Sequence, residues 1–148
     1  MQISAVREAI ADAARAVVLP AGVGKLTSSG FVPDDVTEPH FFTAEYSVEY
    51  DKAFGRGLDQ IELTCRVLVG RADDQAAQKI LDALLSGSGP ASLKTAIEAA
   101  RGAPGGAALG GLADDLHVMR VQGYRWYEHA GTQYVGAELV IKVIGDGS

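Results

Sequence analysis

Residues 39–70 read PHFFTAEYSVEYDKAFGRGLDQIELTCRVLVG and contain two runs of alternating side chains around a short loop. A period of two is typical of strands that are buried on one side. We therefore expect two long antiparallel strands joined by a tip loop over residues 52–58, with an apolar face that another layer covers. The side chains predicted for that face are Phe42, Ala44, Tyr46, Val48 and Tyr50 on the first strand and Ile61, Leu63, Cys65, Val67 and Val69 on the second.

Apolar spacing on both sides of this hairpin predicts three helices. Residues 2–18 carry apolar side chains at helical spacing and stop before Pro20, with Ser4 as a candidate N-cap. A second helix is expected to open at 73–74, because Asp carboxylates suit the N-terminal end of a helix. A third is expected from Pro90 to about Ala100. The predicted inward stripes are Ala77, Ile80, Leu81, Leu84 and Leu85 in the second helix and Leu93, Ala96 and Ile97 in the third.

The last third of the chain predicts a second hairpin, with strands over residues 116–128 and 132–144 and a tight turn at 129–131. In its first strand Met119 and Val121 share one parity, whereas Tyr124 and Trp126 have the other. This change of phase predicts a β-bulge near Gly123. Two weaker segments remain. Residues 25–32 are expected to form a weak, short strand or an extended segment, and residues 102–111 a flexible linker.

The order of these elements is helix, hairpin, two helices and hairpin. It predicts a single α+β domain over residues 1–148. We expect a mainly antiparallel four-stranded sheet, made of the two hairpins and packed against two to three helices. A chain of 148 residues is long enough to bury one such core.

Composition and charge disfavour several classes of function. The net charge of −6 disfavours a general grip on nucleic acid, which requires a basic face. The single cysteine, Cys65, excludes an internal disulfide and is expected to be a buried core thiol. No stretch approaches the ~20 apolar residues of a membrane span, and no signal-peptide pattern is visible. We expect a product made in the cytoplasm, without membrane contact.

The sequence contains no pattern that we interpret as a catalytic, cofactor or metal site. His40, His117 and His129 lack metal-ligand spacing, and the paired aspartates at 34–35, 73–74 and 114–115 lie at element boundaries, where turn and cap roles explain them. The glycine-rich residues 102–111 lack the lysine of a phosphate-binding loop. We expect no enzyme and no cofactor. The alternative is a small enzyme or ligand-binding domain with a pocket between sheet and helices.

Two groups of side chains are candidates for contacts with other proteins. Lys52, Phe54 and Arg56 lie at the tip of the first hairpin, where they either form an ordinary solvated loop or dock on an acidic neighbouring surface. Tyr124, Trp126 and Tyr127 form an aromatic set in the second hairpin. We favour core or subunit-interface packing for this set over a nucleic-acid stacking platform, because only Arg120 and Arg125 accompany it as cations.

Several segments of the sequence resemble those of a known group of viral proteins. They are the opening helix 3–17, GFVPDD at 30–35, YDKAFGRG at 50–57, RADD at 71–74 and LSGSGP at 85–90. Together with the order of elements, they are similar to small structural proteins of long-tailed actinobacterial phages, in particular the tail terminators. The likeness spans nearly the whole chain and contains no catalytic motif.

This resemblance implies a structural virion protein of the tail or neck. Such proteins assemble as a ring, usually of six subunits, on the head-proximal end of the tail tube. They stop polymerisation of the major tail protein and present a surface to the head-tail connector, and double-stranded DNA passes through the lumen as cargo. The alternative within the virion is another head-tail connector or a minor tail protein. A closed ring would use two different faces of each subunit.

Overall fold

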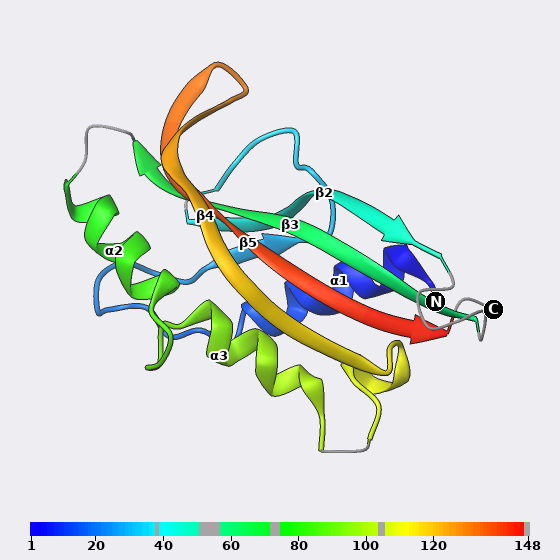
Figure 1. Cartoon of the computed structure of the whole chain (residues 1–148). Helices are drawn as coiled ribbons and strands as arrows, with labels where there is room; N and C mark the ends of the chain where they lie inside the picture. The colour runs from blue at the N-terminus through cyan, green and yellow to red at the C-terminus, as the bar shows by residue number, and fades with distance from the viewer. Residues whose placement is uncertain (38, 51–56, 72–74, 104–105, 147–148) are drawn as a thin grey trace.

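A mixed five-stranded sheet with three helices on one face forms the framework of the described part of the molecule (Figure 1). The computed structural model describes residues 1–37, 39–50, 57–71, 75–103 and 106–146. The helices are α1 (Ile3–Ala14), α2 (Gln75–Leu85) and α3 (Leu93–Glu98), with 3-10 turns η1 (Ala99–Arg101) and η2 (Leu109–Gly111). The strands are β1 (Thr27–Ser29), β2 (His40–Glu49), β3 (Leu58–Arg71), β4 (Asp115–His129) and β5 (Thr132–Asp146), arranged in the order β1-β2-β3-β5-β4.

The two predicted hairpins are present, and β3 and β5 join them into one sheet by antiparallel pairing. The prediction of four strands is wrong, because β1 adds a fifth strand that runs parallel to β2, with Thr27 opposite His40. Three residues are too few for a periodic signal. The position of β1 instead depends on α1. At Gly30, just after the strand, a Cβ atom would lie only 2.9 Å from the backbone nitrogen of Glu8.

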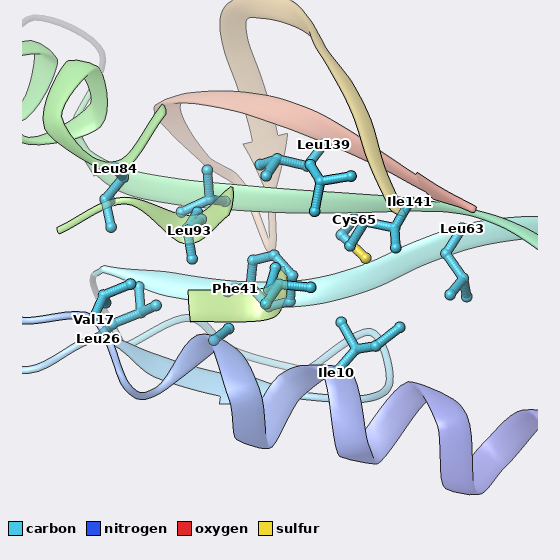
Figure 2. Packing of buried hydrophobic residues seen from close by; sticks show 14 of the residues in the cluster. Ile10, Val17, Leu26, Phe41, Leu63, Cys65, Leu84, Leu93, Leu139 and Ile141 are labelled. Carbon is cyan, nitrogen blue, oxygen red and sulfur yellow. The ribbon is translucent and has the colours of Figure 1, made fainter. Parts of the chain in front are cut away.

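The core lies between the helices and the sheet (Figure 2). Ile10 of α1, Leu84 of α2 and Leu93 of α3 belong to the same buried cluster as Phe41 of β2 and Leu139 of β5. Each such side chain contributes roughly 1.5–3 kcal/mol by leaving water. The predicted apolar face of β3 is confirmed, because all five of its side chains lie in this cluster: Ile61, Leu63, Cys65, Val67 and Val69.

The facing predicted for β2 is wrong in its first half. Phe41 enters the core, whereas Phe42 points to the other side of the sheet and packs with Leu68. The cause is a β-bulge between Thr43 and Glu45, which changes the phase of the strand. Beyond the bulge Val48 packs against the core as predicted, but Tyr46 and Tyr50 are largely exposed.

The helices match their predicted positions but not every predicted boundary. Ser4 lies inside α1, and Gln2 occupies the N-cap position. The helix expected from Pro90 begins at Leu93 instead, because the Ser92 hydroxyl accepts a hydrogen bond from the Thr95 N–H and so caps it. The residues at 73–74 expected to open α2 lie outside the described residues, while its inward stripe is confirmed, with each member buried or packed against the core.

The segment predicted as a flexible linker is partly built into the core. Ala108 and Leu109 are buried in the main cluster. The Ala108 N–H donates to the carbonyl of Ala113 at 2.8 Å, and an isolated antiparallel bridge joins the two residues. Glycine and alanine content alone did not distinguish a linker from a packed turn, because small residues suit both.

The second hairpin forms as predicted. Its turn consists of Ala130 and Gly131, both with positive φ, which is the backbone of a two-residue hairpin turn. The predicted bulge is confirmed by a register shift between Gln122 and Arg125, with Gly123 at φ 64°. A further shift between Val118 and Arg120 was not predicted.

Candidate interaction surface along the edge of strand β4

Strand β4 is the last strand of the sheet, and its side away from β5 has no neighbouring strand in the described residues. It is 15 residues long and carries four large apolar side chains that stay exposed, Met119, Val121, Tyr124 and Trp126. Trp126 is the most accessible of the four at 63%. We call these four residues the β4 edge patch. A long apolar edge is a template for pairing with another chain.

The β4 edge patch is exposed because the helices cover the sheet only in part. Val121 pairs with Leu139 and Trp126 with Val135, and both partners lie in the core. Directly opposed residues of antiparallel strands share a face, so Val121 and Trp126 lie on the helix side of the sheet. Burial, and after it the nearby Asp82 carboxylate of α2, raise the pKa of the Tyr124 phenol.

The opposite, open face of β4 is polar and partly ordered by contacts within the sheet. Arg66 forms an ion pair with Glu138 at 2.9 Å, and its guanidinium lies 4.4 Å from the centre of the Tyr127 ring. Arg125 lies over the same ring at 4.7 Å. The Tyr127 hydroxyl donates to the carbonyl of Gly123 at 2.5 Å, which holds the bulge in place. Burial and the nearby Glu138 raise the pKa of Tyr127.

On the open face, β4 and β2 carry charges of opposite sign. On β4, Arg120 and Arg125 are exposed and pair in register with open-face positions of β5. On β2, Glu45 is exposed and lies opposite Thr64 of β3. Arg120 forms an ion pair of 3.6 Å with Glu62 of β3, whereas Arg125 lies over the Tyr127 ring, so the charges of opposite sign at the two borders are Arg125 on β4 and Glu45 on β2.

Strand β2 provides a second unpaired edge among the described residues. Strand β1 pairs only with His40–Phe42, and Arg7 donates to the Thr43 carbonyl at 3.4 Å, so among the described residues the outer side of β2 has no strand neighbour from Ala44 to Val48. Exposed aromatic side chains gather here too. The Arg7 guanidinium lies 4.4 Å from the Phe31 ring and 5.5 Å from the Tyr46 ring, and both rings are more than 40% exposed.

One end of the open face is covered by the loop that precedes β2. The His129 ring donates a hydrogen bond from Nε2 to the carbonyl of Pro33 at 2.7 Å, and Val36 packs against Phe42 and its neighbours. The His40 ring contacts the hydroxyls of Thr27 and Ser29. Burial and the proximity of His129 lower the pKa of His40 below its ordinary value of 6.5. This end of the face is a closed, structural cluster.

The described residues offer little to a catalytic interpretation. They contain no group of three or more His, Cys, Asp or Glu side chains arranged to hold a metal ion. The Cys65 thiol is fully buried beside the Thr43 hydroxyl, and burial raises its pKa to about 12, so it is not a thiolate nucleophile at neutral pH. The prediction of a buried core thiol is confirmed.

A hollow on the described surface is open and lies outside the core. It measures about 860 Å³ and is lined by residues of the 101–115 segment, including Arg101, Asp114 and Asp115. Arg101 is already held by Asp115 through two hydrogen bonds of 2.7 and 3.2 Å. This hollow does not lie between sheet and helices, where the ligand-binding alternative placed its pocket.

The structure separates the candidate interface residues into three groups. Tyr124 and Trp126 belong to the accessible β4 edge patch, whereas Tyr127 is only 7% exposed and points to the open face with its ring between two arginines. Lys52, Phe54 and Arg56 lie outside the described residues. Sequence reasoning missed Met119 and Val121, although alternation along an edge strand that faces water was the available signal.

Comparison with models of protein families finds no family that matches this sequence, and comparison with curated proteins finds no match either. Within the described residues, every helix is too short or too polar to cross a membrane.

Proposed function

We propose that this protein is a structural subunit of a phage tail, and that it forms a ring, most simply a hexamer, which ends the tail tube at its head-proximal side. In this role it has no enzymatic activity and requires no cofactor. Its partners are further copies of itself, the major tail protein and the head-tail connector, and double-stranded DNA passes through the lumen. The proposal rests on the sequence resemblance to tail terminators and on the exposed edge of the sheet.

The observation that carries the structural role is the β4 edge patch. In a domain that functions alone, a terminal strand of 15 residues with four exposed large apolar side chains would favour aggregation. Natural edge strands are usually short, charged or covered. An exposed apolar edge of this length is therefore best explained by another protein chain that covers it.

A closed ring is supported by the presence of two different unpaired edges in the described residues, on β4 and on β2. Head-to-tail rings use two unlike surfaces of each subunit, whereas two-fold dimers use one surface twice. An open sheet face that lined the lumen would present both signs of charge to the DNA, because Glu45 and Glu62 lie there together with Arg120 and Arg125.

The proposal is tested by imaging the purified protein and a lysate of phage that lack it. We expect ring-shaped particles with a central hole, and tails of irregular, excessive length when the protein is absent. Antibody labelling should mark the junction of head and tail. Labelling along the tube would instead assign the protein to the minor tail proteins. Tails of normal length in the deletion lysate would overturn the terminator role.

A further inference from the structure

We propose that neighbouring copies join by β-sheet extension, with the outer edge of β4 beyond Val118 in one copy pairing antiparallel with the outer edge of β2, from Ala44 to Val48, in the next. This inference adds a contact geometry to the proposed ring, and it rests on the proposed function for the closure of that ring. The result is a continuous sheet that passes from subunit to subunit, with the helices of each copy on the same side.

The directions of the strands permit this joint. Strands β2, β3, β5 and β4 are adjacent in that order, and each neighbouring pair is antiparallel. Because the direction alternates along these four strands, β4 runs opposite to β2. A second copy placed beside β4 in the same orientation therefore presents its β2 antiparallel to β4, and the alternation continues across the joint.

The apolar side chains on the helix side would meet in this arrangement. Val121 and Trp126 lie on the helix side of β4, as their register partners show. Tyr46 of β2 pairs with the core residue Leu63 and so lies on the same side of the sheet. In the joint, these three side chains, which are exposed in a single copy, would be buried against one another. Aromatic residues of this kind are common anchors at protein interfaces.

The charges on the open face would also match. Arg125 borders the β4 edge beside Arg120, which also pairs with Glu62 of its own chain at 3.6 Å, and Glu45 borders the β2 edge. The joint brings cations of one copy beside an anion of the next. This charge pattern disfavours a two-fold dimer formed through either edge. Pairing β4 with β4 of a second copy would bring arginines together, and pairing β2 with β2 would bring two Glu45 carboxylates together.

A charge-swap cycle tests the joint. The variants are Arg125→Glu, Glu45→Arg and the combination of both, with Lys79→Glu as the control, because Lys79 is exposed on the side of α2 away from the buried residues Ala77 and Leu81. Assembly is measured by light scattering over a range of concentrations, and circular dichroism confirms that each variant is folded. We expect each single reversal to weaken association about tenfold or more, the double swap to recover most of this loss, and the control to match the unmodified protein.

Photo-crosslinking of nearly unmodified protein provides a second measurement. A benzophenone amino acid in place of Trp126 should link to a peptide within residues 40–50 of another copy, identified by mass spectrometry. The same group at Val18, which is exposed and lies in the segment after α1, should not form this link. Crosslinks from position 126 to β4 or to the helices of another copy would overturn the proposed joint.

The outcomes separate this inference from the proposed function. Rings that persist unchanged in both single reversals would overturn the β4–β2 joint and leave the ring itself standing. An unmodified protein that stays monomeric at all concentrations, alone and with tail tubes, would overturn both.

Discussion

The two strands of the second hairpin have the same length and opposite surroundings. From Tyr134 to Ile141 every residue of β5 is buried, whereas β4 buries only Leu116, Val118 and Tyr127 along its whole length. Strand β5 lies between β3 and β4, while β4 has a strand on one side only in the described part of the chain. Position in the sheet, more than apolar content, therefore decides which strand is core and which is available as a surface. The stability of the dissociated monomer distinguishes the two strands, because substitutions should cost much more in β5 than in β4.

The largest effect is expected at Leu139, whose side chain is buried in the core. Leu139→Ala should lower the free energy of unfolding by about 2–5 kcal/mol, because it removes buried methyl groups and leaves a cavity. Its partner across the hairpin, Val121, is the matched control, since it is 42% exposed at the edge. Val121→Ala should cost much less. Urea denaturation measures both, and equal losses would contradict the contrast between the strands.

Gly136 of β5 should tolerate no side chain. A Cβ atom there would lie 2.5 Å from the carbonyl oxygen of Val67 and 2.8 Å from Cδ2 of Leu68. Gly136→Ala is expected to destabilise the fold by about 1–3 kcal/mol through overpacking. Gly87→Ala serves as the control, because a Cβ atom at that position would meet nothing within 4 Å beyond its neighbours in the chain. If both variants unfold at the same urea concentration, the close approach of β3 and β5 is wrong.

A smaller, pH-dependent effect is expected at His40. Its folded pKa is lowered by burial first and by His129 second, so below about pH 6.5 the unfolded chain takes up a proton before the folded protein does. Stability should therefore fall as pH drops from about 6.5 toward the lower folded pKa, with no contribution from His40 above that window. The lowered pKa values of Glu98 and Asp115 act only in more acidic solution.

Unfolding midpoints between about pH 7.5 and 5.5, together with an NMR titration of the ring, measure this effect. His129→Gln keeps a hydrogen-bond donor for Pro33 but removes one cause of the lowered pKa. We expect the His40 midpoint to rise in this variant. A midpoint at or above 6.5 in the unmodified protein would show that the ring is not buried as described.

The smallest effect on the monomer is expected at Trp126, the most exposed member of the β4 edge patch. Trp126→Ala should change the free energy of unfolding by no more than about 0.5 kcal/mol, because little of the side chain leaves water on folding. The same variant should weaken assembly by about 2 kcal/mol or more if the ring anchors on this residue. Calorimetry of the monomer and light scattering of the assembly separate the two. A large loss of monomer stability would assign Trp126 to the fold.

Local sequence signals predicted the elements that depend on neighbours along the chain. The alternation of Ile61 to Val69 gave the inward face of β3, and the phase change around Gly123 gave a bulge. The bulge at 43–45 in β2 was missed, because Ala44 continues the alternation and no glycine marks the irregularity. The candidate surface was predicted in part. Tyr124 and Trp126 were chosen for their residue types, yet the same argument included Tyr127, which the bulge turns to the other face and buries.

By itself the sequence determined the α+β class, both hairpins, the inward stripes of the helices and the burial of the only cysteine. These features follow from periodicity and turn chemistry within short segments. Only the tertiary structure decided that β3 pairs with β5, that β1 joins the sheet in parallel, and that β4 and most of β2 have no strand on their outer side among the residues described. Such pairings join residues far apart in the chain, and their free energy comes from packing that no local pattern encodes.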